Sequence, residues 1–314
     1  EHEHLSYPEA LRFLANKYNI EIQDKELSAE EVAEKNLRDS LLIVTNFARK
    51  YFQEHLKSHS EGKSVGMSYL KERSVREDII DKFELGYSLD QWEDFTQTAL
   101  KKGFKQEYLE KAGLTIVKEN KRYDRFRGRI MFPIHSLSGN VVGFGGRILK
   151  KDEKAAKYLN SPESEIYHKG NILYGIYQAK KAITKNDRCY MVEGYTDVLA
   201  LHQKGLDNVV ASSGTSLTEN QIRLVKRFTP NITIIFDGDS AGIKASLRGI
   251  DLILEQGMNV KVVPLPDDED PGFFSKKQSA SEFVRYLKDN EQDFIHFKTH
   301  LLSQEAENEG CIVV

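Results

Sequence analysis

The chain has 314 residues, enough for about two domains with cores of their own. Its 45 basic and 48 acidic residues give a net charge of −3, which favours no partner by itself, and its two cysteines form neither a metal-ligand spacing nor a disulfide framework. There is no run of about 18 apolar residues and no signal peptide, so we expect a soluble, cytoplasmic protein without a membrane partner.

The first 27 residues are expected to be the end of a preceding segment and a linker. The chain opens on Glu1 without a methionine, which indicates a fragment. Ser6 and Pro8 mark a helix start, Leu11, Leu14 and Tyr18 share one face of that helix, and residues 20–27 resemble a linker.

Residues 28–115 are predicted to form a helical subdomain that serves as a scaffold. Ser28 and Glu31 form a capping-box pattern, and apolar residues then recur at helical spacing to about Lys57. After a break at 58–66, Ser74 and Glu77 predict a second capped helix that ends before Gly86. Segments 89–103 and 105–112 repeat the helical pattern.

From Tyr123 the pattern becomes that of strands. RIMFPIH and NVVGFGGRIL, separated by SLSG, predict a β-hairpin. Between Lys121 and Lys157 ten basic residues stand against three acids. Arg125, Arg127 and Arg129 recur at a spacing of two, which places them on one face of an extended segment. Such a face can be merely solvated, or it can bind phosphates.

Residues 116–185 are therefore predicted to be a mixed α/β, basic subdomain that binds nucleotides and nucleic acid. Guanidinium groups suit phosphates, an aromatic ring suits base stacking, and an asparagine suits a hydroxyl or a phosphate. The candidate residues are Arg125, Arg127, Arg129, Arg147, Lys157, Tyr158, Asn160 and Lys169.

Residues 186–271 carry acidic clusters at the ends of apolar runs that read as strands. The clusters are EGYTD (from Glu193), FDGD (from Phe236) and PDDED (from Pro266). Strands and helices alternate here, which predicts an α/β fold with a parallel sheet flanked by helices. Because the carboxyl ends of parallel strands meet in one crevice, the acids should converge there. Carboxylates that repel one another need divalent cations, so we predict a magnesium site.

Several motifs resemble a known family. EGYTD, FDGDSAG and PDDEDP, in that order, resemble the Toprim domain of primases, topoisomerases and some nucleases. RFRGRIMFPI, GFGGR, KYLNSPE, HKG and ASSGTS resemble the RNA polymerase region of bacterial DNA primase, over about residues 32–271. The family's PDGxDPD reads PDDEDPG here, with Asp268 and Gly272 as departures. SYPEALRFLANKYNIEI resembles the end of that family's zinc domain.

The resemblance implies which residues carry the chemistry. Catalytic residues would be Glu193, Asp237, Asp239 and Asp267. The metal ligands would be Glu193, Asp237 and Asp239, with Asp197 either a further ligand or a residue that caps its helix or pairs with a lysine. The cofactor would be Mg²⁺, with Mn²⁺ as a substitute, and zinc is expected only in the N-terminal domain that this chain lacks.

The resemblance also implies the partners of a template-directed RNA polymerase at a bacterial replication fork. They are single-stranded DNA template, ribonucleoside triphosphates and the RNA–DNA hybrid, with single-stranded DNA-binding protein as a further partner and the core as a monomer. The replicative helicase would bind through a C-terminal domain absent here, and residues 272–314 are expected to be a peripheral helical segment.

Other classes stay open on the residues alone. A Toprim nuclease would share the metal ligands, and a non-enzymatic clamp would lack some of the acids that are present here. A topoisomerase would need a separate domain with a catalytic tyrosine. A primase–helicase fusion is disfavoured because no GxxxxGK[ST] loop occurs.

Overall fold

The computed structural model describes residues 7–18, 20, 28–119, 121–150, 155–214, 216–236, 240–266 and 269–299. For residues 7–10, 12, 236 and 240–247 it describes the backbone alone. The chain divides into two compact units, Glu1–His168 and Lys169–Val314. Within the described ranges, no helix is both long and apolar enough to cross a bilayer.

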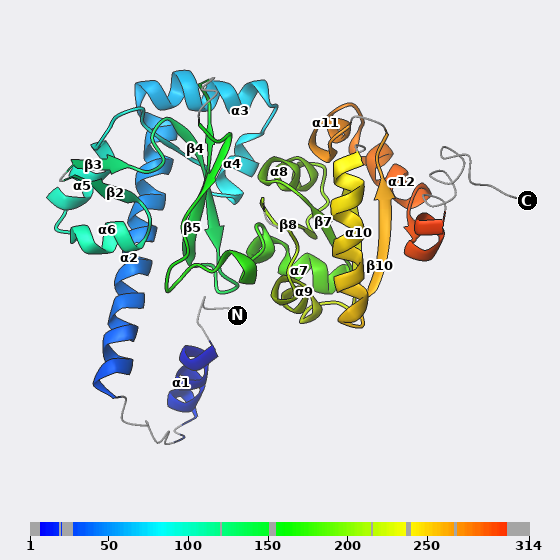
Figure 1. Ribbon diagram of the computed structural model, residues 1–314, viewed down its shortest axis with the longest axis horizontal. Coiled ribbons are helices and arrows are strands. Elements are labelled where there is room, and N and C mark those ends of the chain that lie inside the picture. Colours follow the sequence, from blue (N-terminus) through cyan, green and yellow to red (C-terminus); the bar gives the residue numbers. More distant parts are fainter. Residues whose placement is uncertain are drawn as a thin grey trace, which may run out of the picture. The chain divides into compact units, whose positions relative to one another are not determined.

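The first unit is built around a long helix and an antiparallel sheet (Figure 1). Its helices are α1 (Tyr7–Lys17), α2 (Ala29–Ser58), the π-helix Gly62–Met67, α3 (Ser68–Glu72), α4 (Glu77–Lys82), α5 (Asp94–Lys101) and α6 (Gln106–Lys111). Its strands are β1 (Gly86–Ser88), β2 (Thr115–Lys118), β3 (Lys121–Asp124), β4 (Arg129–His135), β5 (Val141–Ile148) and β6 (Tyr158–Asn160).

Helix α2 packs its apolar face on the sheet of order β1-β4-β5-β6. Leu41, Ala48 and Phe52 are buried at helical spacing along that face. The predicted capping box is confirmed, since Ser28 Oγ accepts from Glu31 N and Glu31 Oε2 accepts from Ser28 N. The predicted β4–β5 hairpin is also confirmed, with Phe132 opposite Gly145.

Two predictions about the helices of the first unit are wrong. The break at 58–66 is confined to His59, after which the chain continues helically, and Gly62 lies so close to His55 O that a Cβ there would be 1.7 Å from it. The cap at Ser74 and Glu77 does not form. Ser74 adopts a left-handed φ of 56°, and α4 begins at Glu77 without a side-chain cap.

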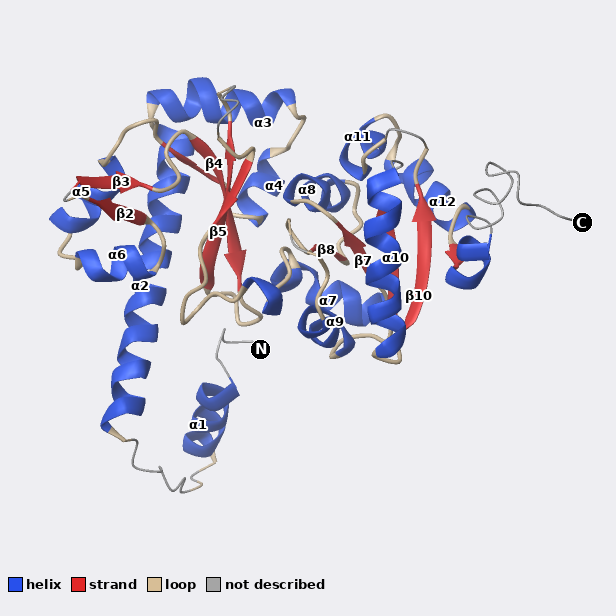
Figure 2. Ribbon diagram, in the orientation of Figure 1, coloured by secondary structure: helices blue, strands red, loops and turns tan. Residues whose placement is uncertain are grey.

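The second unit is a helix-covered sheet of order β11-β10-β9-β7-β8 (Figure 2). Its strands are β7 (Cys189–Val192), β8 (Val209–Ala211), β9 (Asn231–Phe236), β10 (Asn259–Pro264) and β11 (Gln292–Asp293). Its helices are the 3₁₀ turn Lys169–Asn171, α7 (Ile176–Asn186), α8 (Tyr195–Gln203), α9 (Glu219–Lys226), α10 (Ser240–Glu255), α11 (Pro271–Lys276) and α12 (Ala280–Asp289).

The predicted parallel sheet is confirmed, because β8, β7, β9 and β10 all run in parallel. Cys189 is fully buried in β7, and burial raises the pKa of its thiol. Helix α9 has a side-chain cap, with Thr218 Oγ1 accepting from Gln221 N. Gly257, with a φ of +66°, follows the end of α10.

The C-terminal segment, expected to be helical over 272–314, is helical only in part within the described residues. Helix α12 ends at Asp289, and β11 then adds an antiparallel edge strand to β10 before residues 294–299 turn helical again. Glu291 explains the interruption. Its carboxylate, 11% exposed, pairs with Arg188 and Lys261 and accepts from Thr233 Oγ1 at 3.0 Å, which ties this segment to three parts of the sheet.

Candidate active site

Glu193 lies at the carboxyl end of β7, where the strand gives way to helix α8. The strand before it is fully buried, whereas Glu193 itself is exposed. Its carbonyl oxygen accepts a hydrogen bond from Ser213 N at 3.0 Å, in the loop after β8. The glutamate is therefore fixed through its main chain at the edge of the sheet where ligands of α/β folds bind.

Asp197 caps its own helix. The side chain is 8% exposed, and its Oδ2 accepts from Gly194 N at 3.0 Å. Its Oδ1 approaches the start of α11, because a Cβ on Gly272 would lie 3.0 Å from that atom and 3.2 Å from Asp270 Oδ1. Asp270 in turn caps α11 through Phe273 N at 2.7 Å. The capping role left open for Asp197 is thus seen directly, and its role as a metal ligand stays a proposal.

Asp237, Asp239 and Asp267 lie outside the described residues. The strands that precede them in sequence do end side by side, since Phe236 pairs with Pro264 in parallel and β7 is the next strand in the sheet. Among the described residues, no three His, Cys, Asp or Glu side chains converge closely enough to hold a metal ion. The donor set nevertheless fits Mg²⁺, because carboxylate oxygens are its preferred ligands and Glu193 presents one at this edge.

In the first unit, Arg147 lies between two tyrosines. Its Nη1 donates to the Tyr158 hydroxyl at 2.8 Å, and its guanidinium carbon is 5.2 Å from the ring centres of both Tyr158 and Tyr69. Arg73 approaches the same Tyr69 ring at 5.5 Å. Tyr158 faces Arg147 because β6 pairs with β5 in that register. Two cations and two aromatic rings are thereby gathered, and no ion pair of Arg73 or Arg147 forms among the described residues.

Arg125 extends this group toward Asn160. Its Nη2 donates to Asn160 O at 3.4 Å, and burial lowers the pKa of its guanidinium. The Nε atoms of both Arg125 and Arg147 are buried without a hydrogen-bond partner. Within the described part of the chain neither arginine forms an ion pair, so each retains donors that an anion could satisfy.

The prediction that Arg125, Arg127 and Arg129 share one face of an extended segment is wrong. Residues 125–128 form a turn, with Gly128 at a φ of +66°, and β4 begins only at Arg129. Arg129 is 7% exposed, and its Nη1 donates to the carbonyls of Gly146 and Ala156, each at 3.1 Å. Arg129 therefore holds the backbone beside the site and does not face solvent.

Arg127 is half-buried, and its neighbours were missed by the sequence reasoning. Its guanidinium carbon lies 3.6 Å from the Trp92 ring centre, and its Nε is 3.3 Å from Asp90 Oδ1. Trp92 is 62% exposed and stands 5.4 Å from Tyr123. Trp92 is the only tryptophan of the chain, which could have marked it as a residue that stacks on bases. The prediction of a helix over 89–103 gave no reason to expect it at a binding surface. Tyr69 and Arg73 carried no such signal.

Lys157 and Lys169 fall in different units. Lys157 is exposed just before β6, and its carbonyl accepts from Ile148 N at 3.1 Å. Lys169 belongs to the second unit, where its Nζ donates to Gly214 O at 3.1 Å. Lys169 is thus tied to the same loop that holds the Glu193 main chain.

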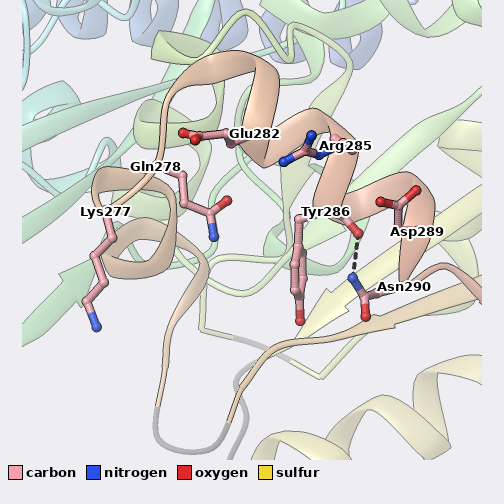
Figure 3. A pocket seen from close by; sticks show the side chains of 7 residues that line it. All are labelled: Lys277, Gln278, Glu282, Arg285, Tyr286, Asp289 and Asn290. Atoms are coloured by element: carbon pink, nitrogen blue, oxygen red, sulfur yellow. Dashed lines mark hydrogen bonds between the residues drawn. The ribbon is translucent and has the colours of Figure 1, made fainter.

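A separate pocket of about 380 Å³ lies along α12 and the turn before it, and none of the predicted residues lines it (Figure 3). Lys277 and Arg285 line it together with Glu282 and Asp289. Two acids offset two bases, so the pocket has no preference for a polyanion. It does not fit the chemistry of the site described above.

Comparison with known families matches both units. Residues 51–180 match the family described as DNA primase catalytic core, N-terminal domain, and residues 190–274 match the family described as Toprim-like. The DNA primase of Clostridium acetobutylicum is 39% identical over 283 residues, which cover 90% of this chain and 46% of that protein. The DNA primase of Halalkalibacterium halodurans is 36% identical over a stretch that covers 98% of this chain and 51% of that protein. The chain thus spans about half the length of these relatives.

Solved structures of primase domains are also similar to this chain. A DNA primase domain from Pseudomonas aeruginosa has a TM-score of 0.77 at 36% identity, covering 84% of this chain and 83% of that one. The RNA polymerase domain of Mycobacterium tuberculosis primase DnaG has a TM-score of 0.80 at 32% identity, covering 88% and 91%. A DnaG primase catalytic domain bound to single-stranded DNA has a TM-score of 0.73 at 35% identity, covering 81% and 80%.

The parallel sheet with acidic loops at its carboxyl edge defines the Toprim class of nucleic-acid enzymes. An antiparallel sheet that carries arginines and tyrosines precedes the Toprim sheet in the chain. The match of this part to the primase catalytic core identifies which Toprim family the chain belongs to. The chain belongs to the DNA primase family, as part of the catalytic core.

Proposed function

We propose that this chain carries out template-directed synthesis of short RNA primers on single-stranded DNA. The main support within the structure is the contrast between the units, each considered by itself. The first unit presents Arg125 and Arg147, which form no ion pair with the described carboxylates, and the second unit presents an exposed glutamate at the carboxyl edge of a parallel sheet. The arginines of the first unit suit a polyanion, and the glutamate of the second unit suits a cation.

We propose that Glu193, Asp237 and Asp239 hold divalent cations, Mg²⁺ or Mn²⁺ in its place, with Asp197 and Asp267 beside them. Such cations neutralise the triphosphate and the pyrophosphate that leaves. The family match to Toprim proteins and the common edge at which β7, β9 and β10 end support this assignment. Asp197 would act chiefly by keeping Gly194 in place, since its Oδ2 already accepts from that amide.

The basic residues would bind and orient the nucleic acid and the nucleotide. Arg147 and Arg125 would contribute guanidinium groups, which suit phosphate oxygens and form no ion pair with the described residues. Tyr158 and Trp92 offer rings for bases, and Lys157 adds an exposed charge. Lys169, in the second unit, would contact the nucleotide's phosphates. No side chain needs to act as a covalent nucleophile, because positioning and electrostatics supply most of the catalysis in phosphoryl transfer.

The whole DNA primases that this chain matches over about half their length suggest roles for its segments. We propose that the segments 1–27, 28–115, 116–185, 186–271 and 272–314 act as the remnant of a zinc domain, a helical scaffold, a basic subdomain, the catalytic domain and a C-terminal extension. Zinc, the replicative helicase and single-stranded DNA-binding protein would then engage the whole primase at a bacterial replication fork. What supports these proposals is that the relatives named DNA primase are about twice as long as the stretch that they share with this chain.

The deciding experiment incubates the protein with single-stranded template, labelled ribonucleotides and magnesium. New oligoribonucleotide that disappears in Glu193→Gln is the expected result. A shortened template would instead identify a nuclease, and an unchanged template with no product would identify a binding protein. Thermal melting of Glu193→Gln serves as the control for folding, because the exposed side chain can lose its charge without disturbing the core.

A further inference from the structure

We infer that the loop after β8, residues 212–214, is a positioning element that fixes Lys169 relative to Glu193. This inference rests on the proposed function, in which Glu193 holds a metal ion and Lys169 contacts the phosphates of the same nucleotide. Ser213 N donates to Glu193 O at 3.0 Å, and the Gly214 carbonyl accepts from Lys169 Nζ at 3.1 Å. One short turn therefore touches both residues, and all three belong to the second unit.

The backbone of the turn has an unusual conformation. Ser213 has a φ of +57° and is 8% exposed, and Gly214 follows with a φ of +83°. Residues other than glycine rarely adopt this left-handed region, so Ser213 stays there only because its surroundings hold it. The consequence is directional: the amide of Ser213 is presented to Glu193, and the carbonyl of the next residue is presented to Lys169.

The main chain around Lys169 is fixed to the same connection. Gln221 Nε2, on α9, donates to Lys169 O at 3.2 Å, and Thr218 Oγ1 donates to Gly170 O at 2.5 Å. Tyr174 and Ala211 exchange two backbone hydrogen bonds at the edge of β8. The lysine is thus anchored at its base by α9 and β8, and only its tip depends on the turn. A change in the turn should move the amine without unfolding the segment.

In-line phosphoryl transfer depends on where the metal ligand and the phosphate contact lie with respect to each other. The turn should therefore affect nucleotide use more strongly than it affects stability. The structure supplies a matched control in Gly205, which ends α8 with a φ of +82° and has no atom within 4 Å of a Cβ built on it. Both glycines are exposed. An alanine at either position meets the same backbone strain.

The experiment compares Gly214→Ala with Gly205→Ala in the full chain. Similar drops in melting temperature are expected, but only Gly214→Ala should raise the KM for ribonucleotides, by about tenfold or more. Equilibrium Mn²⁺ binding, measured by electron paramagnetic resonance without nucleotide, should weaken in Gly214→Ala and not in Gly205→Ala. Gly214→Asn should raise the KM less than Gly214→Ala does, but still more than Gly205→Asn, because asparagine enters the left-handed region more readily than alanine. If Gly214→Ala does not fold, Gly214→Asn against Gly205→Asn makes the same comparison.

A double-mutant cycle with Lys169→Met tests whether Gly214→Ala raises the KM through the lysine. If the turn acts through the lysine, Gly214→Ala should raise the KM no further in the Lys169→Met background. Additive effects, or equal kinetics for the two alanine variants, would overturn the inference. Failure of the proposed function would look different, since Glu193→Gln and Lys169→Met would then leave primer synthesis unchanged in the parent background.

Discussion

The guanidinium of Arg127 lies over the Trp92 ring, with its central carbon 3.6 Å from the ring centre. Asp90 pairs with Arg127 at 3.3 Å and also with Lys150, so this part of the surface contains both charges and an exposed indole. The contact orders the ring while 62% of the tryptophan surface remains accessible. An ordered, exposed aromatic ring beside a cation is what base stacking on a single strand requires.

Trp92→Ala should therefore weaken binding of single-stranded DNA by about 1–3 kcal/mol while leaving its salt dependence unchanged. Arg127→Ala should lower the slope of log affinity against log salt by about 0.7. Fluorescence anisotropy at several salt concentrations measures both. Trp92→Phe should fall between parent and alanine, and Arg223→Ala, an exposed arginine paired with Glu219, serves as the charge control. Equal affinity of Trp92→Ala and the parent would remove the ring from the interface.

Arg129→Met should destabilise the fold more than Arg127→Met. Arg129 is buried and satisfies the carbonyls of Gly146 and Ala156, so its loss should cost about 1–3 kcal/mol. Arg127 is half-exposed in a surface ion pair, and its loss should cost less than about 1 kcal/mol. Urea unfolding of the two variants provides the comparison. Equal midpoints would show that the Arg129 hydrogen bonds contribute nothing to stability.

The regular elements of this fold could be predicted from the sequence, whereas the positions of single arginines could not. The hairpin was predictable because apolar strands flank SLSG, and the parallel sheet because buried runs alternate with helical patterns. The fate of Arg125, Arg127 and Arg129 was not predictable, since a spacing of two has meaning only in an extended chain and Gly128 turns this one. Strand β11 has two residues, too few for any periodicity, and it forms because Glu291 finds partners far away in sequence.

Asp124 should make stability depend on pH. Its carboxylate, 7% exposed, accepts from Phe95 N at 2.8 Å, Thr96 N at 3.0 Å and Thr96 Oγ1 at 2.6 Å. Burial raises its pKa from 3.8 to about 6, although these hydrogen bonds oppose the rise. Between those two values the folded state binds more protons than the unfolded state, so stability should fall as pH rises from about 4 to 6.

Asp124→Asn should abolish this part of the pH dependence, which amounts to up to about 3 kcal/mol for a shift of about two units. Urea unfolding from pH 4 to 7 provides the measurement. The difference in the free energy of unfolding between parent and variant should change from about pH 4 to 6 and stay constant above pH 6. Parallel curves for the two proteins would show that Asp124 titrates as an ordinary carboxyl.

Asp237→Asn should separate catalysis from binding. The substitution preserves side-chain volume but removes a charge from the proposed metal site, so primer synthesis should fall by orders of magnitude. Single-stranded DNA binding should persist because it depends on the basic residues of the first unit. Without metal the melting temperature should stay equal or rise as repulsion among acids decreases.

Oligoribonucleotide yield across a Mg²⁺ and Mn²⁺ titration measures the effect of Asp237→Asn. Asp251→Asn is the matched control, since Asp251 is an exposed acid on α10 that approaches Lys298 at 3.9 Å. Parent-level synthesis by a folded Asp237→Asn protein would contradict the metal-site assignment.

The antiparallel pairing of β11 with β10 determines how far this chain can be shortened. The Toprim-like match ends at residue 274, before α12 and β11. A protein cut there would lose Glu291 and leave the outer row of β10 amides and carbonyls without partners. An uncovered strand of this kind recruits strands from other molecules. We therefore expect the shortened protein to self-associate more readily than the full chain, because Lys261 and Val262 lose their partners in β11.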